Sequence, residues 1–238
     1  MFVAELGFRG RSAEDVFAAA WEDQRVLETA NMKGRTFEVV RLFPTFVWKS
    51  QFDQATYKAI NQTILAQLPQ WAGSGIGGAW QSGSGLHKLD ALRALVACID
   101  AEVRSVLDFL KIGATGYEIT GCWANALEPG TTHAMHSHPN NFLSGVYYVQ
   151  IQPGADNINF HDPRPQTSII RPPVTELTAY NTDQVVVSVA EGMLLLFPAW
   201  LAHSVSANCS DRQRISVSFN VMFAEYEKRM SPPLWGGP

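Results

Sequence analysis

Histidines gather in one part of the sequence, where their spacing could support metal chemistry. The chain has six histidines among its 238 residues, and four of them lie within 29 positions: His133, His136, His138 and His161. His136 and His138 are one residue apart, so on a β-strand both imidazoles would project from the same face. Two nitrogen donors on one strand suit a divalent transition metal. An HxH pair also occurs by chance in surface loops, so it needs further ligands to define a site.

A candidate for the next ligand is His203, which follows a strongly apolar strand. That strand is expected over Met193 to Phe197, and a turn containing Pro198 separates it from the histidine. An apolar strand that delivers one histidine at its far end, about 65 residues after an HxH pair, is typical of a double-stranded β-helix metal site. The alternative is that His203 only caps a turn and hydrogen-bonds to backbone.

A third segment, RISVSFNV, begins at Arg214 and alternates strictly between polar and apolar residues. One face of the expected strand carries the polar side chains, which are those of Arg214, Ser216, Ser218 and Asn220. If the apolar face packs on helices, the polar face points into a cavity. A guanidinium there can bind a carboxylate through two hydrogen bonds, and a hydroxyl two residues on can add a third. Otherwise this is an edge strand with a solvated polar face.

The elements that must position these residues change character along the chain. Amphipathic helices are expected in the first half, over residues 12–30, 53–69 and 88–111. From Gly116 onward, short apolar or alternating runs are separated by turn residues, which is typical of an antiparallel sandwich, barrel or jelly roll. We therefore expect one α+β structural domain with four parts: an N-terminal helical extension (1–35), supporting helices and first strands (36–115), a β core (116–226) and a C-terminal tail (227–238).

Composition excludes several other classes of protein. The formal net charge of −4 offers no basic field for nucleic acid or an anionic membrane. No apolar run approaches the roughly 18–20 residues needed to span a bilayer, and the N-terminus lacks the pattern of a secretory signal. The three cysteines are far apart and odd in number, which fits a reducing cytoplasm better than a disulfide framework. Hydrophobic residues make up 46% of the chain, enough for a sizeable core.

Taken together, HSHPNNFLSGVYYV, NFHDPR, GMLLLFPAWLAH and RISVSFN resemble the Fe(II)/2-oxoglutarate-dependent oxygenase superfamily. More narrowly, they resemble a bacterial and phage family of 2-oxoglutarate–Fe(II) oxygenases. The resemblance extends over roughly residues 40 to 224, and the N-terminal residues lie outside it. It implies a cupin-like double-stranded β-helix, or jelly roll, with flanking N-terminal helices.

The resemblance also implies a ligand set. His136 and His203 would bind Fe(II), with His138 at the position where the superfamily more often has an acidic residue. Arg214 and Ser216 would bind the distal carboxylate of 2-oxoglutarate, and either Tyr147 or Tyr148 could reach the same cosubstrate.

The imidazole at position 138 leaves the third ligand open. A triad of two histidines and one carboxylate neutralises one charge of Fe(II), whereas three neutral histidines leave both. Either His138 binds the metal, or two histidines do so with water, or Asp162 supplies a carboxylate. Asp162 can also be read as a turn residue before Pro163.

The implied activity is hydroxylation of a small-molecule or peptidyl substrate with O2, releasing succinate and CO2. Two alternatives remain open: a cupin-like metal dioxygenase or isomerase that uses three histidines without 2-oxoglutarate, and a non-catalytic jelly-roll binding module. The first would not need Arg214. The Gly- and Ser-rich stretch from Gly73 to Gly85 is expected to be a surface loop or a lid, and a homodimer is compatible with the sequence.

Overall fold

The computed structural model describes residues 29–32, 35–38, 42–71, 78–113, 116–164 and 169–227. The chain divides into two compact units, Met1–Phe46 and Val47–Pro238. In the first unit, β1 (Thr29–Met32) and β2 (Arg35–Glu38) form an antiparallel hairpin. The helix predicted over residues 12–30 lies outside the described residues up to position 28, and its last two positions belong to β1.

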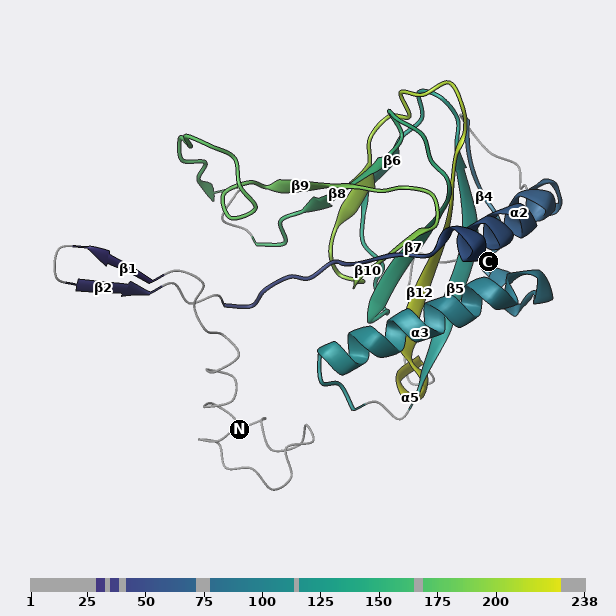
Figure 1. Cartoon of the computed structure of the whole chain (residues 1–238), viewed down its shortest axis with the longest axis horizontal. Coiled ribbons are helices and arrows are strands. Elements are labelled where there is room, and N and C mark those ends of the chain that lie inside the picture. Colours follow the sequence, from purple (N-terminus) through teal and green to yellow (C-terminus); the bar gives the residue numbers. More distant parts are fainter. Residues whose placement is uncertain are drawn as a thin grey trace. The chain divides into compact units, whose positions relative to one another are not determined.

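The second unit is built on two antiparallel sheets (Figure 1). The strands of the larger sheet, in spatial order, are β3 (Trp48–Gln51), β10 (Met193–Pro198), β7 (Leu143–Gln150), β12 (Arg214–Phe223), β5 (Tyr117–Leu127) and β4 (Ala79–Gln81). Those of the smaller sheet are β6 (His133–His136), β11 (His203–Val205), β8 (Asn157–His161) and β9 (Gln184–Ser188). The expected strands from Gly116 onward are therefore present.

Helices cover the outer face of the larger sheet (Figure 1). They are α2 (Gln54–Trp71) and α3 (Arg93–Phe109), and a short α5 (Ala224–Glu227) follows β12. Asp53 caps the start of α2, because its carboxylate accepts hydrogen bonds from the amide and hydroxyl of Thr56 at 3.0 and 2.6 Å. Along α3, buried Leu95, Ile99, Val103 and Val106 recur every three or four residues and face the sheet.

The helix predicted over residues 88–111 begins later than expected. Two 3₁₀ turns, Leu86–Lys88 and Asp90–Leu92, precede α3, and Leu89 between them is extended. These turns bury Leu86 and Leu92, so the apolar spacing of the helix continues through residues that are not α-helical. Hydrophobic periodicity alone therefore placed the helix start too early.

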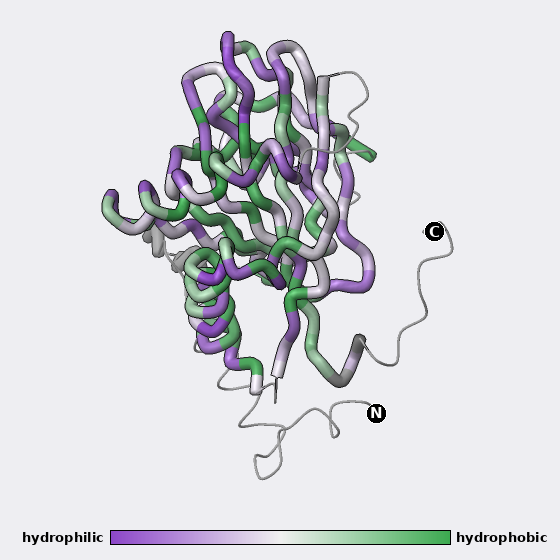
Figure 2. Tube along the Cα trace, turned by 90° about the vertical axis from the view of Figure 1, so that its right-hand side faces the viewer, coloured by the Kyte–Doolittle hydropathy of each residue, from purple (hydrophilic) through white to green (hydrophobic). Residues whose placement is uncertain are grey.

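Hydrophilic and hydrophobic residues intermingle along the strands (Figure 2), and the buried apolar side chains divide between two cores. One core lies between the helices and the larger sheet, and it contains Ile215, Val217 and Phe219 of β12. The other lies between the two sheets and contains Tyr148 of β7 and Phe197 of β10. The polar alternate residues of β12 consequently face the space between the sheets, as the sequence pattern predicted. The architecture is the expected α+β jelly roll with flanking helices.

Two further sequence expectations concern the Gly- and Ser-rich stretch and the membrane. Residues 72–77 lie outside the described residues, but Ala79–Gln81 form the edge strand β4 and Gly85 forms a bridge with Cys122. The later part of the stretch is therefore held in the sheet and is not a free loop. Within the described ranges, no helix has both the length and the apolar character needed to cross a bilayer.

Gly145 of β7 allows a close cross-strand contact. It pairs with Phe219 of β12, and a Cβ added to Gly145 would lie 2.2 Å from the Phe219 ring, which is fully buried. Gly145→Ala should therefore lower the free energy of unfolding by about 1–3 kcal/mol, the usual cost of overpacking. Chemical denaturation measures this change.

The matched control is Gly113→Ala, because an added Cβ there meets no atom within 4 Å. Equal stability of the two variants would contradict this account of the Gly145–Phe219 contact.

Candidate metal centre and cosubstrate pocket

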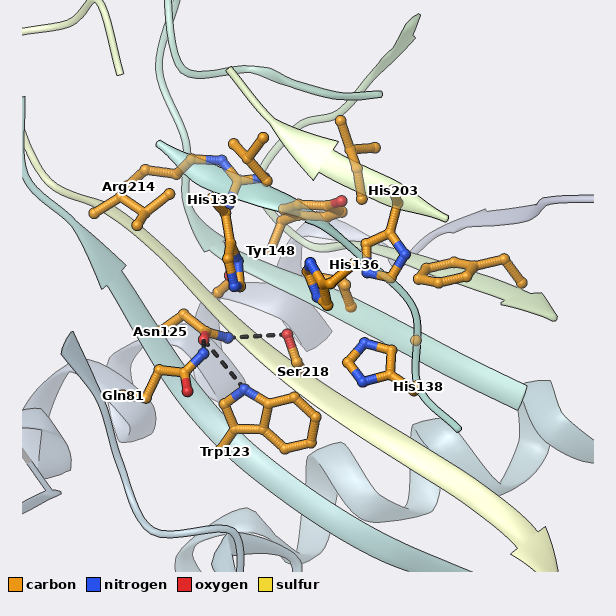
Figure 3. Close-up of a pocket in the computed structure, with 17 residues that line it drawn as sticks. Gln81, Trp123, Asn125, His133, His136, His138, Tyr148, His203, Arg214 and Ser218 are labelled. Carbon is orange, nitrogen blue, oxygen red and sulfur yellow. Dashed lines mark hydrogen bonds between the residues drawn. The ribbon is translucent and has the colours of Figure 1, made fainter. Parts of the chain in front are cut away.

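A pocket opens between the two sheets and brings together most of the residues singled out in the sequence. It encloses about 260 Å³, close to the lower end of the roughly 300–1,000 Å³ of ligand pockets. Histidines from β6, β11 and the segment after β6 lie on one side, and Arg214 from β12 lies at one end (Figure 3).

Three histidines converge in this pocket. Each of His136, His138 and His203 offers one ring nitrogen, and these atoms all lie within 4.8 Å of one another. The ring centroids of His136 and His203 are 4.3 Å apart, and those of His138 and His203 are 5.2 Å apart. Strand pairing produces this proximity, because His203 of β11 is directly opposite His136 of β6. Such a group of imidazoles can hold a divalent transition metal.

Backbone contacts orient two of these rings. The Nδ1 of His136 lies 2.8 Å from the carbonyl oxygen of Ala134, and the Nδ1 of His203 lies 3.0 Å from that of Leu201. A carbonyl only accepts, so each Nδ1 must carry the proton and donate it. The Nε2 of each ring is then left with a free lone pair, the state that a metal ligand requires. The donor set therefore fits Fe(II).

Burial keeps two of the histidines uncharged. It lowers the pKa of His203 to about 3, although the hydrogen bond to Leu201 opposes the shift. Burial, with further contributions from His136 and His133, lowers the pKa of His138 to about 4. Because both pKa values lie well below neutrality, both rings are neutral near pH 7. The His203 ring would then bind a metal without first losing a proton.

The position of His138 differs from the sequence expectation. His136 is the last residue of β6, and His138 lies beyond the strand, where its backbone amide donates to the carbonyl of Ala199 at 2.9 Å. The expectation that one strand face presents both imidazoles was therefore wrong. The turn after β10 holds the chain at His138, and the ring centroids of His136 and His138 are nevertheless only 5.0 Å apart.

Arg214 is a buried cation beside the histidines. Its side chain is 3% exposed, and its Nε donates to the carbonyl of Ala155 at 3.0 Å. Within the described part of the chain, no carboxylate forms an ion pair with it. Burial lowers the pKa of Arg214, but a guanidinium remains protonated in a protein. A buried charge without a counterion is costly, so the pocket is suited to an anion.

Of the two candidate tyrosines, the structure brings Tyr148 to the pocket. Its ring centroid lies 5.2 Å from the guanidinium carbon of Arg214, and its hydroxyl is buried without a well-formed hydrogen bond among the described residues. Burial raises the pKa of Tyr148 to about 12, so the hydroxyl stays protonated and can donate. Tyr147 points to the helical side, where its hydroxyl donates to Asn61 at 2.7 Å.

The remaining two candidates lie in different surroundings. Ser216 is buried and lines the pocket between Arg214 and Ser218 along β12. Asp162 follows β8, does not line the pocket, and accepts two hydrogen bonds of 2.9 Å from the guanidinium of Arg164. Among the described residues, the one group of metal-capable side chains consists of the three histidines.

Sequence reasoning gave no role to several other residues that line the pocket. His133 stacks on His136, with ring centroids 4.5 Å apart and planes at 28°, and it lies between His136 and Arg214 in Figure 3. Gln81, Trp123 and Asn125 come from β4 and β5. Trp123 and Asn125 are two residues apart on one strand, with Ala124 between them, so their side chains share a face. This spacing in CWANAL was the sequence signal that could have pointed to them.

The jelly roll thus carries a pocket of three histidines that could hold a metal ion, next to a buried arginine. Comparisons with known proteins indicate which class of protein has such a site. Residues 121–220 match the model of a family described as "Putative 2OG-Fe(II) oxygenase". This segment includes all three histidines, Arg214 and Tyr148. No curated protein sequence matches the chain.

Solved structures with the same fold are similar over most of their length. A prolyl-4-hydroxylase from Pseudomonas putida aligns with a TM-score of 0.55 and 14% identity, over 75% of this chain and 92% of that one. The alpha-ketoglutarate-dependent carbocyclase SnoK of nogalamycin biosynthesis gives 0.57 and 16%, over 81% and 90%. HygX from Streptomyces hygroscopicus, solved with nickel and 2-oxoglutarate, gives 0.54 and 12%, over 76% and 84%.

The segment that matches the family model also carries the pocket. The match and the three-histidine site together indicate an enzyme that uses Fe(II), 2-oxoglutarate and O2. The structural neighbours establish the fold, and the family match favours this activity over a cupin-like enzyme without 2-oxoglutarate and over a non-catalytic module.

Proposed function

We propose that the protein hydroxylates a small-molecule or peptidyl substrate, with Fe(II) bound by His136, His138 and His203. In the same proposal, Arg214, Ser216 and Tyr148 bind 2-oxoglutarate. The observation that carries it is the buried guanidinium of Arg214, which has no carboxylate partner among the described residues and opens into the pocket of the three histidines. A cupin-like enzyme without 2-oxoglutarate has no use for such a cation.

The side chains at the two ends of the pocket fit the two ends of a 2-oxo dicarboxylate. Arg214 can bind the distal carboxylate through its guanidinium, and the hydroxyls of Ser216 and Tyr148 can donate further hydrogen bonds to it. When bound, Fe(II) supplies the oxygen chemistry, which couples oxidation of 2-oxoglutarate to succinate and CO2 with hydroxylation of the substrate. The apolar walls, which include Val146, Ile158 and Phe197, exclude water from the reacting groups.

Anaerobic addition of Fe(II) and 2-oxoglutarate tests this proposal. We expect a visible charge-transfer band, as an iron-chelated 2-oxo acid gives, and 2-oxoglutarate decarboxylation on admission of O2. A protein that binds Fe(II) but forms no band and releases no succinate would instead fit the cupin-like alternative. A protein that binds metal and shows no turnover of any kind would fit a binding module.

Substitutions at His138 test the third ligand. His138→Asp should retain stoichiometric Fe(II), because a carboxylate at this position restores the commoner triad of two histidines and one carboxylate. His138→Ala should weaken Fe(II) binding about 10–100-fold, because one of three protein donors is lost. Metal content after gel filtration and a competitive chelator titration measure both effects.

Asp162→Ala is the matched control for the alternative third ligand. We expect it to retain Fe(II), because the Asp162 carboxylate pairs with Arg164 outside the pocket. If His138→Ala bound Fe(II) with wild-type affinity and Asp162→Ala lost Fe(II), the third metal ligand would be Asp162 and not His138.

We also propose a cytoplasmic location, with neither nucleic acid nor a membrane as partner. Its support is that Cys98, Cys122 and Cys209 are all unpaired thiols, which suits a reducing compartment, and that the net charge of −4 is unfavourable for polyanion binding. A homodimer is part of the same proposal, and sedimentation analysis tests it.

A further inference from the structure

One wall of the pocket carries a hydrogen-bonded chain of side chains that the binding of iron and 2-oxoglutarate does not use. Asn125 of β5 is its centre and is 5% exposed. The Oδ1 of Asn125 accepts from Gln81 Nε2 at 2.8 Å and from Trp123 Nε1 at 3.1 Å (Figure 3). On its other side, Asn125 Nδ2 donates to the Ser218 hydroxyl oxygen at 2.9 Å.

The indole of Trp123 fixes the direction of every hydrogen bond in this chain. An indole N–H can only donate, so the Asn125 atom that faces it must be the amide oxygen. The Gln81 atom that faces the same oxygen must then be its amide nitrogen. The Asn125 nitrogen must face Ser218, whose oxygen therefore accepts. The positions of the amide oxygen and nitrogen are consequently fixed in both Gln81 and Asn125, and a flip of either amide would break the hydrogen-bond pattern.

The two ends of the chain each keep a polar group available for a ligand, and these two groups are of opposite kind. Gln81 Oε1 is a free acceptor on an exposed side chain, at the outer part of the wall. The Ser218 hydroxyl proton is a free donor deeper in the pocket, because no acceptor among the described residues takes it. Between Gln81 and the metal site lies the Trp123 ring, whose centroid is 5.8 Å from that of His138.

The charge of the pocket restricts what can occupy this wall. Among the described residues, no aspartate or glutamate lines the pocket. Three neutral imidazoles leave both charges of Fe(II). With two positive charges on Fe(II), two negative charges on 2-oxoglutarate and one positive charge on Arg214, the loaded pocket keeps a net charge of about +1. A cationic substrate group would meet net positive charge at low dielectric, so a neutral group is favoured.

We propose that this wall is the substrate-recognition site and that it binds a neutral, amide-bearing substrate such as an uncharged peptide segment. A substrate N–H donates to Gln81 Oε1, a substrate carbonyl accepts from Ser218, and the amide plane between them stacks on Trp123. The reacting C–H is thereby brought toward the His138 side of the metal centre. This inference rests on the proposed function, since it names the substrate class of the same site.

Blocked amino acids are suitable probes, and the Trp123 indole N–H is the reporter. Its resonance in a ¹H–¹⁵N spectrum is assigned by its absence in Trp123→Phe. N-acetyl-alanine methylamide should shift this resonance with a Kd of about millimolar order, as expected for a fragment of this size. N-acetyl-proline dimethylamide has carbonyls but no N–H donor, and it should bind about five- to tenfold more weakly. The positively charged N-acetyl-lysine methylamide should also bind more weakly.

The variants then test each polar group. Gln81→Leu and Ser218→Ala should each weaken the binding of N-acetyl-alanine methylamide about five- to tenfold, which is the effect of losing one neutral hydrogen bond. The matched control is Gln184→Leu, because Gln184 is also an exposed glutamine on an edge strand but lies outside the pocket lining. It should bind the probe as wild type does.

The titrations use metal-free protein, and Fe(II) and 2-oxoglutarate affinities are measured separately. If the wild-type protein binds the amide probe but neither Fe(II) nor 2-oxoglutarate, the proposed function is wrong and the recognition site still stands. Three outcomes would overturn the inference itself. Either no probe shifts the indole resonance, or all three probes bind with equal affinity, or the Gln81 and Ser218 variants weaken the binding of 2-oxoglutarate and not that of the amide probe.

Discussion

His203→Ala should abolish stoichiometric Fe(II) binding. His203 is 4% exposed and sits opposite His136 across the β6–β11 pair, with its Nδ1 held by Leu201 and its Nε2 left free. Loss of one of three protein donors, whose ring is already oriented by Leu201, leaves a pair that water must complete, and we expect the Fe(II) affinity to fall at least a hundredfold. Iron content after gel filtration and a chelator competition measure the loss.

The matched control is His161→Ala. His161 lies on β8, hydrogen-bonds to the Ser204 hydroxyl at 2.9 Å, and does not line the pocket. It should keep wild-type iron content. Unchanged iron in His203→Ala would remove the three-histidine centre from the proposal, because no other group of metal-capable side chains occurs among the described residues.

Arg214→Ala should leave Fe(II) in place and reduce 2-oxoglutarate affinity more than a hundredfold. The distal carboxylate would then be buried with no cation, and removing one partner of a buried charge pair typically costs about 3–5 kcal/mol. Arg214→Lys should recover only part of the loss, because an ammonium cannot make the two parallel hydrogen bonds of a guanidinium. Titration of the charge-transfer band measures the affinity.

Iron content and the unfolding transition are the controls for this substitution, since Arg214 also holds the carbonyl of Ala155. A folded, iron-loaded Arg214→Ala protein with wild-type 2-oxoglutarate affinity would show that the carboxylate binds elsewhere. In that case His133, which lies near both Arg214 and His136, would be the next residue to replace.

Local pattern predicted much of the β core and of the site. The alternation of RISVSFNV correctly divided β12 between the helical side and the pocket, because a strand has a period of two whatever its neighbours are. The apolar run before His203 likewise predicted β10 and the turn that follows it.

Features that depend on long-range pairing could not be predicted in this way. Strand parity alone could not decide between Tyr147 and Tyr148, because both faces of β7 are buried. His138 is placed by its hydrogen bond to Ala199, and the amide chain joins Gln81 of β4 to Asn125 of β5 and Ser218 of β12. No local spacing encodes these contacts.

The contact between Arg214 and Ala155 has a thermodynamic consequence. Arg214 opens β12 of the larger sheet, whereas Ala155 lies just before β8 of the smaller one, so a single guanidinium ties the two layers together. An anion that binds this guanidinium also offsets the free-energy cost of burying an unpaired charge. If 2-oxoglutarate binds to Arg214 as proposed, it stabilises the folded state by its free energy of binding, so cosubstrate occupancy and folding stability are linked.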